Sequence, residues 1–161
     1  MSTVHVGLAA AAFAFLLALP MSTRVAHAKG DGDGPPPRKN VLGGPLERCC
    51  SKRPVGFFRD GFCRVGAEDL GLHAVCAEVT DEFLAFTRAR GNDLSTPRPQ
   101  LQFPGLRAGD RWCLCASRWQ EALDAGQAPK VDLAATDQAA LDVVDLAALQ
   151  RHAIRTDDRA R

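Results

Sequence analysis

The stretch 72-LHAVCAEVTDEFLAFTRARG-91 predicts a strand that leads directly into a helix. Residues 72–79 are mostly small, apolar or β-branched, which favours a short strand in the centre of a sheet. Thr80 suits the N-cap of the helix, and the two acidic residues after it favour the positive end of the helix dipole. Phe83 and Phe86 lie on the side of the helix predicted to face the core, and Gly91 can take the left-handed conformation that ends a helix.

The segments on either side of this stretch predict further short elements. Residues 57–64 contain an Asp-Gly pair between aromatic residues, which is typical of a β-hairpin. Residues 111–115 predict a strand, residues 117–125 a helix, and residues 130–133 another strand, while Asp145 is placed to cap a last helix. Strands and helices without regular alternation predict an α+β two-layer domain with a short mixed or antiparallel sheet, a β-hairpin and about three helices.

Residues 1–28 are predicted to be a signal or targeting peptide. Residues 6–19 form an apolar run that is shorter than the roughly 20 residues of a membrane-spanning helix. Ala26 and Ala28 provide the small residues of a leader-peptidase site. The sequence therefore predicts a secreted or lumenal protein with no stable membrane anchor once the leader is removed. Because no Lys or Arg precedes the apolar run, import into an organelle such as a plastid is the alternative.

The rest of the chain divides by composition. Residues 29–39 are a Gly/Pro-rich linker, residues 40–153 are the predicted domain, and residues 154–161 are a charged tail. Cleavage after residue 28 removes one of 20 basic residues and none of 19 acidic ones, so the mature chain has 20 − 1 = 19 of each. A net charge of about zero predicts that nucleic acid is not a partner. The sequence does not identify a protein or small-molecule partner.

The chain is rich in cysteine, with all six residues in the predicted mature part. They are Cys49, Cys50, Cys63, Cys76, Cys113 and Cys115. An even number of cysteines behind a leader predicts disulfides, and six cysteines allow 15 pairings, among which the sequence does not choose.

A zinc site is the first candidate for chemistry. His73, Cys76, Cys113 and Cys115 together provide an imidazole and three thiolates, a donor set that suits tetrahedral zinc. However, residues three apart on a strand point to opposite faces, so His73 and Cys76 converge only if the strand turns or bulges.

Other interpretations of these residues stay open. Cys113 and Cys115 could act as a redox dithiol. An enzyme could instead use Cys113 or Cys115 as a thiol, or His73 as a base oriented by Asp69, Glu68 or Asp93. Alternatively, the cysteines are core residues or structural disulfides.

The segment 91–109 is rich in proline and glycine and is predicted to be a long irregular loop. Polar residues in it are candidates for binding a polar ligand: Asn92, Asp93, Ser95, Thr96 and Arg98. The alternative is that these side chains hydrogen-bond to their own backbone and shape the loop.

Six motifs in order carry a resemblance to a known family: NVLG (40–43), GFFRDG (56–61), GLHAVCA (71–77), GNDLSTP (91–97), FPGL (103–106) and GDRWCLCA (109–116). With these motifs the chain resembles domain-of-unknown-function family 2237 over about residues 40–153. The resemblance implies an α+β two-layer fold and no established activity. Cys50 stands where the family pattern has Ser, so this thiol pairs with a distant cysteine or stays free. Asp137 stands where the family often has His, which weakens any site that would use that position.

These observations favour a small ligand- or metal-binding module built around His73, Cys76, Cys113 and Cys115. A thiol-dependent enzyme or redox protein and a purely structural or interaction domain are the alternatives. Whether the protein is an enzyme stays open at this stage, and zinc is the candidate cofactor.

Overall fold

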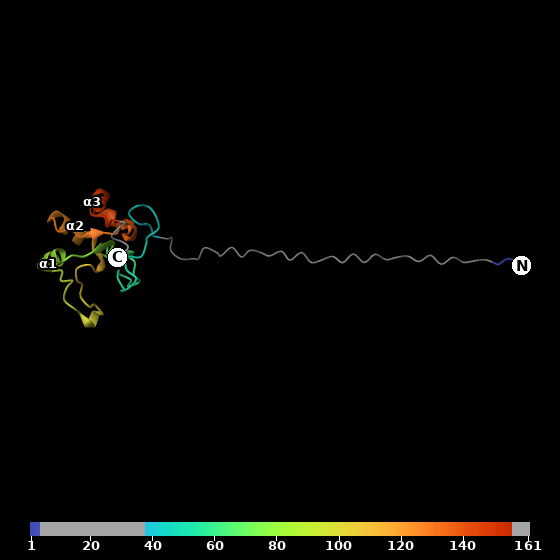
Figure 1. Cartoon of the computed structure of the whole chain (residues 1–161), viewed down its shortest axis with the longest axis horizontal. Coiled ribbons are helices and arrows are strands. Elements are labelled where there is room, and N and C mark those ends of the chain that lie inside the picture. The colour runs from blue at the N-terminus through green and yellow to red at the C-terminus, as the bar shows by residue number, and fades with distance from the viewer. Residues whose placement is uncertain (4–37, 156–161) are drawn as a thin grey trace. The chain divides into compact units, whose positions relative to one another are not determined.

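The computed structural model describes residues 1–3 and 38–155, and in the latter range three antiparallel strands and three α-helices form an α+β domain (Figure 1). The strands are β1 (Val75–Glu78), β2 (Arg111–Leu114) and β3 (Lys130–Val131). The helices are α1 (Asp81–Ala89), α2 (Ala116–Asp124) and α3 (Leu146–Arg151). Short 3-10 helices are η1 (Pro99–Leu101), η2 (Leu133–Ala135) and η3 (Gln138–Asp142). The predicted α+β class and number of helices are confirmed.

Most of the predicted leader and linker, and most of the charged tail, lie outside the described residues. The signal peptide and these domain boundaries therefore stay predictions. Among the residues that the structure describes, no helix has the length and apolar character needed to cross a bilayer.

The sheet has the order β2-β1-β3, so the strand predicted to be central is central. It is shorter than predicted, because regular pairing begins only at Val75. In the antiparallel register Val75 lies opposite Leu114 and Cys76 lies opposite Cys113. Directly opposed residues point to the same face of a sheet. The two cysteines therefore share one face, and Val75 and Leu114 share the other.

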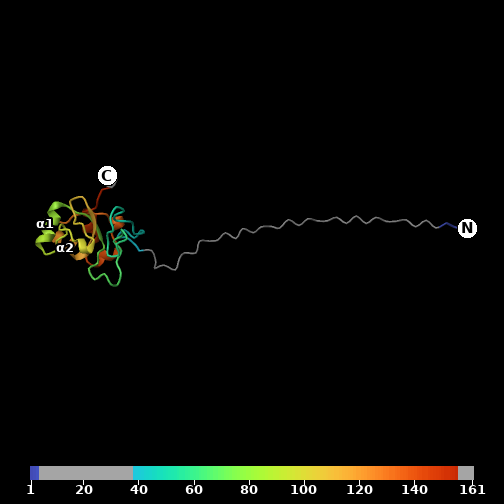
Figure 2. The same cartoon turned by 90° about the horizontal axis from the view of Figure 1, so that it is seen from below.

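The face of Val75 and Leu114 packs against the helices. Phe83 of α1 and Trp119 of α2 are fully buried in this larger core. The indole Nε1 of Trp119 donates a hydrogen bond to the backbone oxygen of Pro129 at 3.1 Å. Figures 1 and 2 show α1 and α2 near each other, and the two helices are in contact. This side of the sheet thus carries a conventional apolar core.

The opposite face of the sheet packs against the segment before β1. Cys76 and Cys113 lie there with Cys49, Cys63 and Val55 in a smaller buried cluster. Since cysteines make up most of this cluster, sulfur rather than hydrocarbon holds residues 49–63 on the sheet.

The beginning and end of α1 agree with the sequence prediction. The Thr80 hydroxyl oxygen accepts a hydrogen bond from the backbone N–H of Phe83, as expected of an N-cap. Gly91 has a φ of 81°, the left-handed conformation that follows many helices.

The predicted hairpin at residues 57–64 is wrong, because this segment forms turns and bends instead of two paired strands. Its backbone pairs with an earlier segment: the N–H groups of Cys49 and Cys50 both donate to the oxygen of Gly61. Arg59 and Gly61 both have positive φ, and Cys63 is bonded to β2. Long-range attachments thus replace the local pairing that the Asp-Gly motif suggested.

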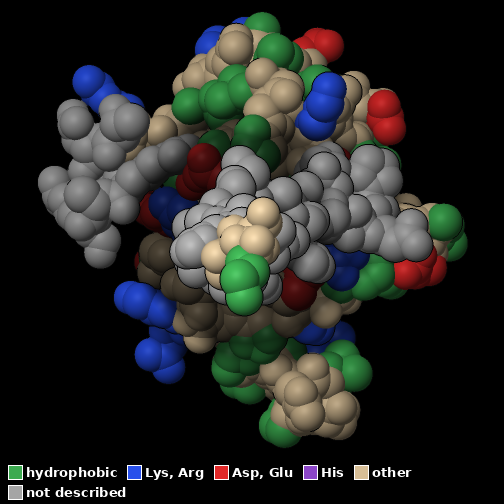
Figure 3. Space-filling model, turned by 90° about the vertical axis from the view of Figure 1, so that its right-hand side faces the viewer, with side chains coloured by type: hydrophobic (Ala, Val, Ile, Leu, Met, Phe, Trp, Pro, Cys, Tyr) green, Lys and Arg blue, Asp and Glu red, His purple; other side chains and the backbone are tan. Residues whose placement is uncertain are grey.

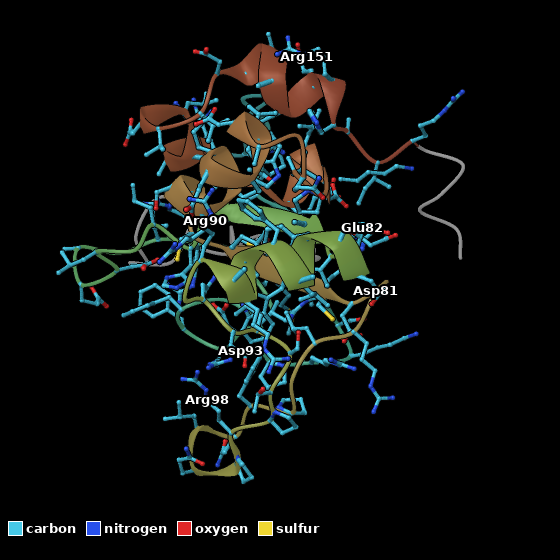
Figure 4. The ribbon with its side chains drawn as sticks, turned by 90° about the vertical axis from the view of Figure 1, so that its left-hand side faces the viewer. Asp81, Glu82, Arg90, Asp93, Arg98 and Arg151 are labelled. Carbon is cyan, nitrogen blue, oxygen red and sulfur yellow. A yellow bond between two sulfur atoms is a disulfide. The ribbon has the colours of Figure 1, made fainter. Side chains whose placement is uncertain are left out.

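The segment after α1 is irregular, as predicted, with only η1 as regular structure. Arg98 and Phe103 form an isolated bridge, with N–H to oxygen distances of 2.7 and 3.2 Å. In Figure 1 this yellow segment extends away from α3, and Figure 4 shows Arg98 on it, far from Arg151.

On the face shown in Figure 3, acidic and basic side chains are interspersed. The absence of nucleic-acid binding stays a prediction.

Candidate thiol–histidine site

The structure divides the four predicted zinc ligands between two places. Cys76 forms a disulfide with Cys49, and Cys113 forms one with Cys63. His73 lies instead with Cys115, which keeps a free thiol. The second free thiol is Cys50, in agreement with one of the two outcomes expected for it. Two disulfides indicate an oxidising compartment.

A buried carboxylate fixes the orientation of His73. Asp69 has no exposed side-chain surface, and its Oδ1 lies 2.6 Å from Nδ1 of His73. Its other oxygen accepts the backbone N–H of His73 at 2.9 Å. The turn that brings them together includes Leu72 with a φ of 46°, an uncommon conformation for a bulky side chain. Because Asp69 occupies Nδ1, the Nε2 atom remains available to a thiol or a substrate.

Cys115 lies where β2 ends and α2 begins. It is the N-cap residue of α2, and its side chain makes no capping hydrogen bond. The first N–H of the helix, from Ala116, donates to the backbone oxygen of Leu72 at 3.0 Å. This bond ties the start of α2 to the turn that carries His73. The positive end of a helix dipole favours an anion such as a thiolate at this position.

Gly71 makes the close approach of the thiol and the imidazole possible. A Cβ atom at this position would lie 2.8 Å from Cε1 of His73 and 3.4 Å from Sγ of Cys115. Both groups therefore pack over the same glycine, and a larger residue would push the ring aside.

The pKa of His73 is raised from 6.5 to about 9, chiefly by the hydrogen bond with Cys115. Burial opposes this rise, while hydrogen bonding to Asp69 and the charges of Cys115 and Asp69 add to it. The imidazole is therefore protonated at neutral pH. Since the pKa is higher in the folded state, this protonation stabilises the fold fully below pH 6.5, and the stabilisation is lost as the pH rises through about 9.

We predict that Cys115→Ala lowers the pKa of His73 well below about 9, because it removes the largest cause of the shift. NMR titration of the His73 ring protons measures this pKa directly. Cys50→Ala is the matched control, because Cys50 is the other free thiol. An unchanged His73 titration in Cys115→Ala would show that the thiol does not contact the ring.

A cavity of about 460 Å³ adjoins His73. Its wall includes three of the five predicted ligand-binding residues, Asn92, Asp93 and Arg98. Its remaining polar and apolar wall comes from Gly56, Phe57, Arg59, Gly91, Leu94, Leu101, Phe103, Trp112 and Cys113. His73 is the member of the thiol–histidine site that lines it. The cavity thus combines aromatic side chains with two guanidinium groups.

Several loop side chains are used to shape the loop itself. Asp93 accepts hydrogen bonds from the backbone N–H groups of Ser95 and Thr96 and from the Thr96 hydroxyl. These bonds lower the pKa of Asp93 to about 2. Asn92 donates its side-chain N–H to the Thr87 hydroxyl oxygen at 2.9 Å. Among the three, Arg98 is the one whose side chain makes no hydrogen bond or ion pair with the described residues.

The sequence did not reveal every residue that builds this region. Asp69 was one of three candidates for orienting His73, and spacing alone did not select it. Cys49 and Cys63 were not assigned as partners, because spacing does not determine disulfide pairing. Asp137 is buried and forms an ion pair with Arg38, so its role in this structure is structural.

Comparison with known proteins agrees with the resemblance. No curated protein matches the chain. A family model described as an uncharacterized protein conserved in bacteria matches residues 39–153. This match covers most of the chain and essentially all of the described domain, so the chain belongs to domain-of-unknown-function family 2237.

Proposed function

We propose that the domain is a thiol-dependent enzyme with Cys115 as its nucleophile. The observation that carries this proposal is that a buried Asp69 holds Nδ1 of His73 at 2.6 Å, while the His73 ring and Sγ of Cys115 pack over the same glycine, Gly71. A nucleophile, a base and a group that orients the base form the arrangement used in nucleophilic catalysis. Asp69 is the orienting residue, because it holds the ring without reaching the cavity.

The reaction that fits these groups is acyl transfer. The Cys115 thiolate attacks a carbonyl carbon and forms a thioester with the enzyme, while the protonated His73 donates its proton to the leaving group. Neutral His73 then takes a proton from water as the water attacks the thioester and releases the acid. The helix start at Cys115 favours the thiolate before the attack.

The adjoining cavity supports a small, polar and anionic substrate. Arg59 and Arg98 place guanidinium groups on a wall that also contains Phe57 and Trp112. Guanidinium groups bind carboxylates and phosphates, and aromatic side chains bind apolar or planar groups. A carboxylate-bearing ester or thioester of small size matches this wall.

A ligand-binding module without catalysis is the second candidate. It is favoured by the position of Arg98 on the cavity wall and by the absence of Cys115 from the residues that line it. Such a module would bind the same anionic compounds reversibly and would form no bond to the thiol.

Incubating the full chain with an aryl ester that carries a carboxylate distinguishes the two. The enzyme proposal expects turnover and a transient acyl adduct on Cys115 by mass spectrometry, and Cys115→Ser is expected to abolish both. Cys50→Ser is the control and is expected to behave as the wild type, since Cys50 is the other free thiol and is not a partner of His73. Turnover equal in wild type and Cys115→Ser would overturn the proposal.

We infer that the domain acts outside the cytosol, in a secreted or lumenal location. The two disulfides support this inference because they persist in oxidising compartments. The predicted leader in residues 1–28 supports it independently. Fractionation of cells that express the full chain tests it, and a chain that retains residues 1–28 and stays in the cytosol would contradict it.

A further inference from the structure

Four cysteines outside the thiol–histidine site meet in one buried place. The Sγ atoms of Cys49, Cys63 and Cys76 all lie within 4.8 Å of one another, and Cys113 is bonded to Cys63. Each of the four residues has at most 2 % of its surface exposed. Within the described ranges, Cys49, Cys63 and Cys76 are the group of three His, Cys, Asp or Glu donors close enough together to ligate a single ion.

We propose that reduction of the two disulfides turns these four cysteines into a zinc site. Zinc–thiolate bonds of about 2.3 Å in a tetrahedron place neighbouring sulfur atoms about 3.8 Å apart. The Sγ atom of Cys63 already lies within 4.8 Å of the Sγ atoms of Cys49 and Cys76, which form the other disulfide, so these three need little movement. The Sγ atom of Cys113 must move closer to the Cys49–Cys76 pair. The two sulfur atoms within each disulfide must separate, which side-chain rotation about the Cα–Cβ bond allows.

The backbone keeps the ligands in two pairs that do not depend on the sulfur–sulfur bonds. Cys76 and Cys113 are directly opposed on the paired strands β1 and β2, whose backbone hydrogen bonds do not depend on the disulfides. Cys49 donates its backbone N–H to Gly61, two residues before Cys63. Two ligands thus lie on the sheet and two on the segment that covers it.

A dithiol serves as the reductant that opens the two disulfides before zinc binds. Each disulfide takes two electrons and two protons from a dithiol, which itself becomes a disulfide, and yields two thiols. One Zn²⁺ then displaces four protons from the four thiols and forms four zinc–sulfur bonds. Soft thiolate donors and tetrahedral geometry select zinc over calcium or magnesium.

The metal would take over the structural role of the disulfides. Residues 49–63 are held on the sheet mainly by sulfur, so the reduced domain without metal loses both long-range links. The site is distinct from the proposed catalytic thiol, because Cys115 is not one of its members.

The test is zinc binding by the full chain after reduction with a phosphine in the absence of oxygen. Native mass spectrometry is expected to show one zinc per chain with the loss of four thiol protons. Alkylation before unfolding is expected to label Cys50 and Cys115 and to spare the four cluster cysteines only when zinc is present. This protection map uses the wild-type chain, so it does not depend on a variant that folds.

Variants give a second measurement. Cys63→Ser removes one ligand and is expected to weaken zinc binding by about tenfold or more, since loss of even an outer-shell partner weakens metal sites by about 10–100-fold. Cys50→Ser and Cys115→Ser leave the four ligands in place and are expected to bind as the wild type. A reduced wild-type chain that binds no zinc, or zinc binding that protects Cys50 or Cys115 instead, would overturn the proposal. Neither result bears on ester turnover, which is measured on the oxidised protein.

Discussion

Replacing Cys63 and Cys113 together by alanine is expected to lower the free energy of unfolding by about 4 kcal/mol, because the bond closes a long loop. The two residues are 50 positions apart, so the disulfide restricts the unfolded chain strongly. The Cys49–Cys76 bond, with a separation of 27, is expected to contribute about 3.5 kcal/mol by the same argument. Denaturation by urea, followed by tryptophan fluorescence, measures both values under oxidising conditions.

Cys50→Ala is the matched control for this experiment, since it removes a cysteine that forms no disulfide. It is expected to change the free energy of unfolding far less than the double variant, because Cys50 is only partly buried and closes no loop. If the Cys63/Cys113 double variant were no less stable than this control, the disulfide would not hold residues 49–63 on the sheet.

His73→Gln is expected to slow alkylation of Cys115 by iodoacetamide at pH 7, because the variant removes the cationic imidazole that is paired with this thiol. The protonated ring of His73, whose pKa is about 9, is the cation paired with this thiol. Glutamine keeps a polar side chain of similar size but carries no charge. Peptide mass mapping over a time course measures the rate at each cysteine separately.

Cys50 is the internal control, because the same mass spectra report its alkylation and His73 is not its partner. Gly71→Ala is a second variant that leaves the thiol, the imidazole and the carboxylate in place. Its added Cβ would meet the ring at 2.8 Å, so it is expected to slow alkylation of Cys115 as well. Equal rates in wild type, His73→Gln and Gly71→Ala would contradict the thiol–imidazole pair.

Local signals predicted the regular elements of the domain well. The helix from Thr80 to Gly91 followed from a capping hydroxyl and a C-terminal glycine, and both act as expected. The hairpin at 57–64 failed because its Asp-Gly motif is local, whereas the segment's partners are Cys49, Cys50 and β2. Where long-range bonds compete with a local preference, the sequence pattern alone does not show which one prevails.

The sequence predicted which residues belong to the candidate site, but it did not predict which of them lie together. His73 and Cys115 were both recognised as reactive residues, but the sequence joined them with Cys76 and Cys113 in one metal set. Alternation along β1 places Cys76 on the face opposite the helices, where it bonds Cys49. The turn at Leu72 precedes the strand, so His73 lies outside the sheet pairing and next to the start of α2.

The sequence by itself determined the α+β class, the order of the elements, the irregular loop after α1 and the family. These features depend on residues that are neighbours in the sequence, so their periodicity, capping and turn preferences can be recognised from the sequence directly. The disulfide pairing and the union of Asp69, His73 and Cys115 were decided only by the tertiary structure. They join side chains far apart in sequence, and their contacts depend on the strand register and on the turn before β1, which no local pattern specifies.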